Sequence, residues 1–205
     1  MDQPQTVNVC LKTTLPPAIK FNEDVLRRLL LPRGTAVEGE TVLIIDYARE
    51  SNPRNDDSAI LAAKIVYDGG VKSYVILGIA SDHWPILELP YQIVQGARRH
   101  SSKKIWIERL ANWPLLSQEI SRQAKKYGID LGHVTFFKPS KKKAAKAERL
   151  RRFHCLCESG NVKFAWGNYT EKVFAQLVNF DCESKTNHTR RDDCADVCGL
   201  LTSHC

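Results

Sequence analysis

The sequence predicts an α/β fold, in which a mixed five-stranded sheet has helices on both faces. Three β-rich segments follow one another in the first half of the chain, and helical and strand patterns alternate in the second half. The first arrangement is typical of an antiparallel meander, and the second of strands joined by crossover helices. Three antiparallel strands followed by two crossover-linked strands therefore describe the expected sheet. A chain of 205 residues is long enough to bury its core.

The meander is expected to open a domain at residues 41–205, after an irregular lead-in or linker at residues 1–40. Within the lead-in, a short helix is expected at 22–31 and ends at Pro32. Asp68-Gly69-Gly70 favours a tight hairpin turn between two strands. The expected strands of the meander are residues 42–46, 58–67 and 71–80.

Helix signals then alternate with short apolar runs. Pro90 suits the first turn of a helix, Asn112 can cap one, and Gly128 can end it. The expected elements are helices at 90–100, 112–127 and 141–157, alternating with strands at 104–108 and 133–137. A short strand at 162–166, a helix at 170–180 and an amphipathic helix at 192–201 are expected to follow.

The net charge of +7 lies in one segment, because residues 138–152 hold eight Lys/Arg and one acid while the rest of the chain is neutral. This basic patch favours an acidic partner such as DNA, although a solvated charged face is the simpler alternative. Phosphate contacts carry little direct sequence information, so weak sequence preference is expected. The residues expected to contact DNA are Lys141, Lys142, Lys143, Lys146, Arg149 and Arg152.

The remaining composition predicts a protein of the cytoplasm with reduced thiols. No apolar run approaches the about 20 residues that span a bilayer, and the N-terminus lacks the pattern of a signal peptide. The seven cysteines cannot all pair within one chain. Cys155 and Cys157 lack the usual paired zinc spacing, and Cys194 and Cys198 sit on an expected amphipathic helix where small apolar residues belong, so buried thiols are favoured over zinc.

Acidic residues end two of the apolar strands and open the last helix. If their strands lie side by side, Asp46 and Glu108 reach the same edge of the sheet. Asp192 and Asp196 are four residues apart and can share a helix face with Asp193 nearby, although capping and the helix dipole also explain such acids. Converging carboxylates repel unless they bind a cation, and hard oxygen ligands select Mg²⁺ or Mn²⁺. Two such ions about 3.5–4 Å apart can hydrolyse a phosphodiester.

The order of these motifs resembles the nuclease domain of phage large terminase subunits, which has the RNase H-like fold of RuvC-type resolvases. The resemblance covers residues 40–202 and rests on TVLIIDYA, KKIWIE and HTRRDDCADVCGLL, with the basic helix SKKKAAKAERLRRF between the last two. It implies the catalytic residues and metal ligands Asp46, Glu108, Asp193 and Asp196, with Asp192 as a further ligand or a helix cap. It places Asp57 beside the site.

The resemblance also implies an activity and partners. The expected enzyme is a Mg²⁺- or Mn²⁺-dependent endodeoxyribonuclease with two ions, which cuts concatemeric viral DNA during packaging in the host cytoplasm. Its partners would be double-stranded DNA, the packaging ATPase domain or subunit, and the small terminase and portal. The chain lacks an ATPase phosphate loop and cannot itself be the motor. The alternatives are a RuvC-like Holliday junction resolvase, a transposase-type nuclease, or a non-catalytic DNA-binding packaging module.

Overall fold

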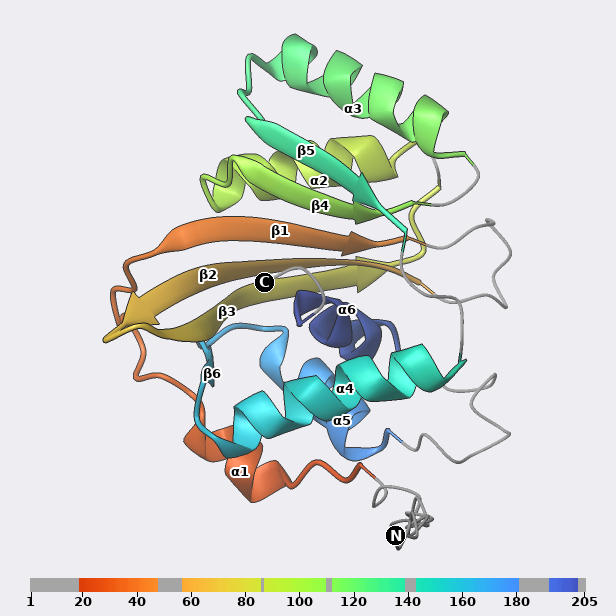
Figure 1. Cartoon of the computed structure of the whole chain (residues 1–205). Helices are drawn as coiled ribbons and strands as arrows, with labels where there is room; N and C mark the ends of the chain where they lie inside the picture. The colour runs from red at the N-terminus through yellow and green to blue at the C-terminus, as the bar shows by residue number, and fades with distance from the viewer. Residues whose placement is uncertain are drawn as a thin grey trace, which may run out of the picture.

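One mixed sheet carries helices on both of its faces (Figure 1). The computed structural model describes residues 19–47, 57–85, 87–109, 112–138, 143–180 and 192–202. The strands are β1 (Glu40–Asp46), β2 (Ser58–Asp68), β3 (Val71–Asp82), β4 (Lys104–Glu108), β5 (His133–Phe137) and β6 (Val162–Phe164). The helices are α1 (Glu23–Arg28), α2 (Leu89–Arg99), α3 (Trp113–Tyr127), α4 (Lys143–Glu158), α5 (Thr170–Val178) and α6 (Asp193–Leu201). None of these described helices is long and apolar enough to cross a membrane.

The strand order is β5-β4-β1-β2-β3-β6. β1, β2 and β3 are antiparallel neighbours, whereas β4, β5 and β6 join the sheet in parallel pairs. The predicted mixed sheet is confirmed, and it has one strand more than the five expected, because β6 pairs with β3 from Tyr74↔Val162 to Ile76↔Phe164. Since β1, β3, β4, β5 and β6 all run in one direction, their carboxyl ends point to the same edge of the sheet, here named the carboxyl edge.

Glycines with positive φ form the hairpin turn and end α3 as predicted. One predicted helix cap does not form. Gly69 and Gly70 between β2 and β3 have φ values of 54° and 83°, which the tight hairpin turn requires. Gly128 ends α3 with φ at 63°. Asn112 stands at the start of α3 as predicted but makes no capping hydrogen bond. Its side-chain oxygen instead accepts a hydrogen bond from the hydroxyl of Tyr47, at 3.0 Å.

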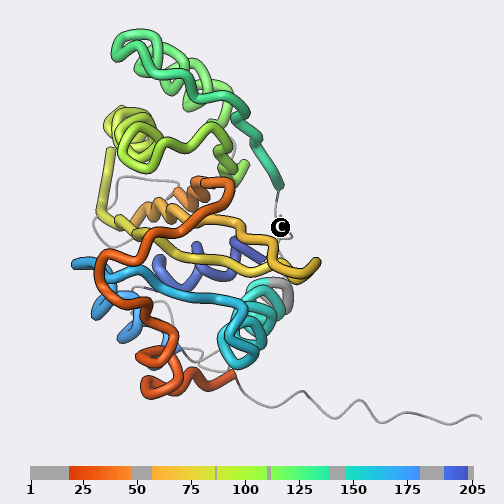
Figure 2. Tube along the Cα trace, turned by 90° about the vertical axis from the view of Figure 1, so that its left-hand side faces the viewer, coloured from red at the N-terminus to blue at the C-terminus, as the bar shows by residue number. Residues whose placement is uncertain are grey.

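Two apolar cores lie on opposite faces of the sheet. In the Cα trace of Figure 2, α2 and α3 lie above strands β1, β2 and β3, and α1 lies below them. α1, α4, α5 and α6 cover one face, and α2 and α3 cover the other (Figure 1). β1 contributes to both, because Val42 and Ile44 face the first core while Leu43 and Ile45 face the second. This alternation explains why the strand is an unbroken apolar run up to its final acid.

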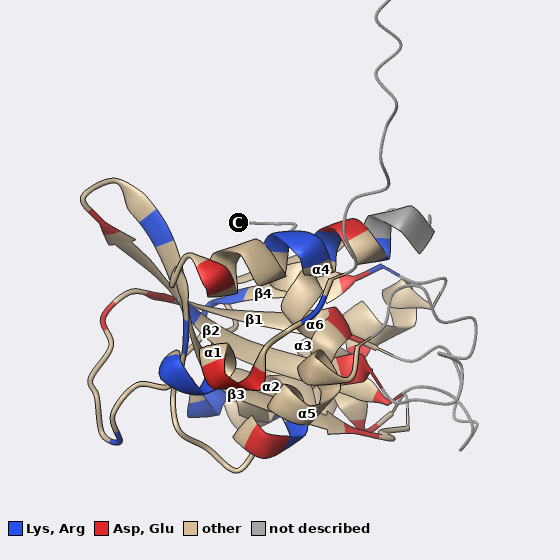
Figure 3. Cartoon of the chain, turned by 90° about the horizontal axis from the view of Figure 1, so that it is seen from below, with Lys and Arg blue, Asp and Glu red and all other residues tan. Residues whose placement is uncertain are grey.

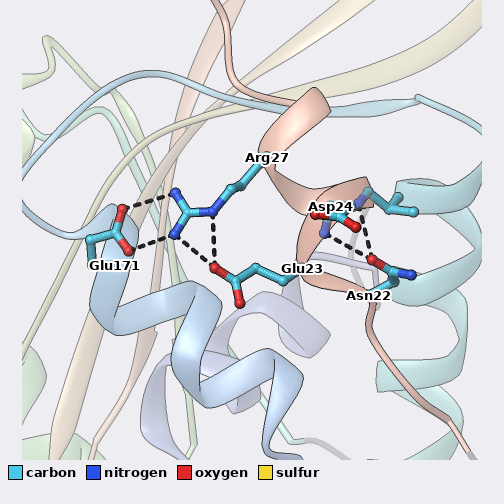
Figure 4. Close-up of polar contacts among 6 residues, drawn as sticks. Asn22, Glu23, Asp24, Arg27 and Glu171 are labelled. Carbon is cyan, nitrogen blue, oxygen red and sulfur yellow. Dashed lines mark hydrogen bonds and ion pairs between the residues drawn. The ribbon is translucent and has the colours of Figure 1, made fainter.

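The described part of the lead-in, residues 19–40, packs onto the same fold. The Asn22 side chain caps α1 by accepting a hydrogen bond from the backbone N–H of Asp24, at 2.8 Å. Arg27 of α1 forms ion pairs with Glu23, at 2.7 Å, and with Glu171 of α5, at 3.0 Å (Figure 4). The apolar side chains of this segment that are buried in the first core are Ile19, Phe21, Leu26 and Leu29.

The contact between α4 and α6 depends on Gly199, which yields a first prediction. A Cβ atom at Gly199 would lie 3.4 Å from side-chain atoms of both Arg149 and Leu150. We expect Gly199→Val to separate the two helices and to lower the free energy of unfolding by about 1–3 kcal/mol, as overpacked cores do. Gly199→Ala is the graded control, because its single added carbon lies at contact distance from α4 and alanine favours a helix over glycine by about 1 kcal/mol. Urea unfolding measures both, and equal stability of Gly199→Val and wild type would contradict the prediction.

Candidate active site

Asp46 and Glu108 lie side by side at the carboxyl edge. β1 and β4 pair in parallel from Val42↔Lys104 to Ile45↔Ile107, so the next residue of each strand is one of these two acids. Their side chains are half-buried and hydrogen-bonded to each other. Burial and the adjacent charge of Glu108 raise the pKa of Asp46 well above its usual range. The site therefore disfavours the ionised form of Asp46.

The first turn of α6 brings a second group of acids to the same place. Asp193 is buried, with 4% of its surface exposed, and the Asp196 side chain is 18% exposed. The charge of Asp196 also raises the pKa of Asp46, so the carboxyls from β1, β4 and α6 converge. Burial raises the pKa of Asp196 itself to about 7, even though Lys146 opposes this shift. The predicted meeting of strand-end and helix acids is therefore present in the structure for Asp46, Glu108 and Asp196.

Lys146 of α4 forms ion pairs with two of these acids. Its Nζ atom lies 2.8 Å from Oδ2 of Asp192 and 2.5 Å from Oδ2 of Asp196. Burial alone would lower the pKa of Lys146, but the charges of Asp196 and Asp192 outweigh it and raise that pKa above its usual range. Asp192 is at the N-cap position of α6 yet makes no capping hydrogen bond. The ion pair, rather than capping, accounts for its position.

The donor chemistry of the site suits a divalent cation. Three segments contribute only carboxylates, which are the hard oxygen ligands that Mg²⁺ and Mn²⁺ prefer. Oδ1 of Asp196 is buried and has no hydrogen-bond partner in the described part of the chain. As the side chains lie, no three His, Cys, Asp or Glu among the described residues form a group that could hold a metal ion. The acids are instead paired, Asp46 with Glu108, and Asp192 with Asp196 through Lys146.

The other predicted site residues lie around this centre. Asp57 is buried directly before β2, whose first residues pair with the end of β1 (Asp46↔Ala59). Arg149 is half-buried on α4, and Arg152 is exposed and paired with Glu148 at 3.3 Å. Figure 3 shows lysine and arginine positions along α4, which packs against α6. The side chains of three predicted DNA-binding residues lie outside the described part: Lys141, Lys142 and Lys143.

Of the four cysteines that the structure describes, three are buried as predicted, and the fourth is exposed against the prediction. Cys157, Cys194 and Cys198 are buried free thiols, whereas Cys155 is exposed. Burial raises the pKa of Cys194, whose sulfur lies 3.4 Å from the hydroxyl of Ser81. The buried thiols therefore stay protonated and contribute packing to the helix that carries the acids.

Solved structures share this fold. The large terminase of bacteriophage HK97 matches 90% of the chain with a TM-score of 0.52 and 13% identity, and the match covers 44% of that protein. The large terminase nuclease domain of Thermus phage P74-26 matches 88% of the chain and 92% of that domain, with a TM-score of 0.50 and 15% identity. A fowlpox virus Holliday junction resolvase matches 80% of the chain and 96% of its own length, with a TM-score of 0.46 and 12% identity. No family model and no curated protein matches the chain.

These similarities identify the class of fold. At such low identities they establish architecture alone, and the architecture is the RNase H-like fold of large terminase nuclease domains. The resemblance expected from the sequence motifs is thus confirmed at the level of the fold. The chain spans less than half of the HK97 large terminase.

We expect the crowded carboxyls of the site to lower the free energy of unfolding. The pKa of Asp46 is raised in the folded state above the unfolded value of about 3.9, so the free energy of unfolding falls as the pH rises above that value. Asn cannot ionise, so we expect Asp46→Asn to raise the Tm in EDTA at pH 8, with a smaller gain at pH 4. Circular dichroism measures the Tm. The control Asp130→Asn, at a side chain that is 71% exposed, should show no gain. An unchanged Tm for Asp46→Asn at pH 8 would argue against the clustering.

Proposed function

We propose that the chain is a metal-dependent DNA endonuclease of the large terminase type, which cuts concatemeric viral DNA during genome packaging. The observation that carries this proposal is the convergence of Asp46, Glu108 and Asp196 from β1, β4 and α6 at the carboxyl edge. The fold similarity to two large terminases supports the choice of nuclease type.

The acids would hold two Mg²⁺ or Mn²⁺ ions. When bound, such ions lower the pKa of a water and stabilise the leaving oxygen of a phosphodiester. The protein itself fixes the positions of the acids. The sheet fixes Asp46 and Glu108 by the β1–β4 register, and α6 carries Asp193 and Asp196, with Asp192 beside them. Because these acids come from buried elements, their separation is set by the two cores rather than by a loop.

The basic helix α4 would hold the DNA backbone beside the acids. Arg149 and Arg152 of α4, together with Lys141, Lys142 and Lys143, would neutralise phosphates, with Lys146 reaching inward to the acids. Such contacts give affinity for double-stranded DNA with weak sequence preference. A terminase-type role further implies a packaging ATPase domain or subunit, a small terminase and a portal as partners in the host cytoplasm.

Plasmid cleavage in Mn²⁺ tests the proposed activity. We expect Asp46→Asn, Glu108→Gln and Asp193→Asn each to lower the cleavage rate by more than about a hundredfold, because even outer-shell partners of metal ligands are worth 10–100-fold. Asp130→Asn, an exposed acid away from the site, is the matched control and should cut as wild type does. Undiminished cutting by both Asp46→Asn and Asp193→Asn would refute the site. A strong preference for four-way junctions over linear duplex would instead indicate a junction resolvase.

Salt-dependent DNA binding tests the role of α4. If Arg149 and Arg152 each neutralise a phosphate, the double variant Arg149→Ala/Arg152→Ala should bind duplex DNA more weakly. The slope of log affinity against log salt concentration should become shallower by about two. Fluorescence anisotropy over a series of salt concentrations gives this slope. Arg122→Ala on α3, whose side chain is 66% exposed, removes one charge elsewhere and should leave the slope unchanged. An unaltered slope in the double variant would exclude these phosphate contacts.

A further inference from the structure

Lys146 places a positive charge between two acids of the candidate site. Its ammonium bridges the Oδ2 atoms of Asp192 and Asp196, at 2.8 Å and 2.5 Å, and so joins two carboxylates that would otherwise repel each other. The two carboxylates are shielded from solvent, with 14% and 18% of the side-chain surface of Asp192 and Asp196 exposed, and Lys146 is half-buried, with 35% exposed. Shielding makes the attraction stronger than that of a surface pair. Lys146 is therefore a built-in counter-ion of the site.

One ammonium does not satisfy all of the acids. Oδ1 of Asp196 is buried without a hydrogen-bond partner among the described residues, although Oδ2 of the same group is paired. A buried carboxylate oxygen without a partner is costly. Asp46 and Glu108, which receive no bridging ion pair from Lys146, share a hydrogen bond with each other instead. A divalent ion carries twice the charge of Lys146 and could use oxygens that the lysine leaves idle.

We propose that Lys146 is a positioning residue that competes with the divalent metal for Asp192 and Asp196 in the DNA-free protein. A metal ion can use the Oδ2 atoms of Asp192 and Asp196 only after the ammonium has withdrawn from them. By pairing with these acids, Lys146 sets the metal concentration at which the site binds its metal. The inference rests on the proposed function, since it takes the acids to be metal ligands.

Isothermal titration with Mn²⁺ in the absence of DNA tests this competition without measuring cleavage. Lys146→Met removes the competing charge, and we expect the Mn²⁺ dissociation constant to fall by a factor of about 5 to 150, the usual range of coupling between two ligands. Lys146→Gln should show the same direction while keeping a hydrogen-bond donor for the carboxylates, which guards against misfolding of the Met variant. Lys146→Arg keeps the charge and should stay near wild type.

Arg152→Met is the matched control. It removes one positive charge from the same helix, at a side chain that is 61% exposed and paired with Glu148 rather than with the site acids. Its Mn²⁺ affinity should equal that of wild type. Circular dichroism in EDTA verifies that each variant is folded before titration.

The possible outcomes separate this inference from the proposed function. Tighter Mn²⁺ binding by both Lys146→Met and Lys146→Gln, with Arg152→Met unchanged, supports the competition. Equal or weaker binding by the folded Lys146 variants overturns the competition and leaves the metal site standing. Absence of Mn²⁺ binding in the wild type and in every folded variant overturns the metal site and the inference together.

Discussion

The parallel pairing of β1 with β4 is the constraint on which the candidate site depends. Ile45 lies opposite Ile107, so the following residues, Asp46 and Glu108, must leave the sheet side by side. The register cannot slip by one residue, because successive β1 side chains alternate between two separate cores and a slip would reverse every one of them. The packing of both faces therefore holds two carboxyls together in spite of their repulsion.

The site joins two acids held by strand pairing with acids held by helix packing. Strand pairing fixes the backbone of Asp46 and Glu108. The acids of α6 are held by helix packing and by the ion pairs from Lys146. α6 itself is apolar and buried almost throughout, so the apolar area that anchors it offsets the cost of crowding charges at its first turn. The stability of the core thus supports a group of acids that would be unfavourable by itself, as is common at functional sites.

The sequence predicted those features whose signals lie in residues close together along the chain. The strands at 104–108 and 133–137 and the glycine turn of the hairpin match the structure, because their signals are local. The meeting of strand-end acids followed from the chain direction of the predicted crossovers. The short strand β6 entered the sheet through a pairing with β3 that no local pattern encodes.

Lys146 was assigned to DNA because it lies in a basic helix. Its approach to Asp192, 46 residues away, depends on the packing of α4 against α6. The metal and DNA roles stay predictions.

The position of α6 along the chain has a consequence for synthesis. A ribosome releases the protein from its N-terminus, and domains fold as their segments become available. A nascent chain that has reached residue 180 already contains every strand of the described sheet, including both sheet acids. It lacks the helix that carries Asp193 and Asp196. The acid centre is therefore completed after the strands of the described sheet have been synthesised, when α6 docks on β1 and β2.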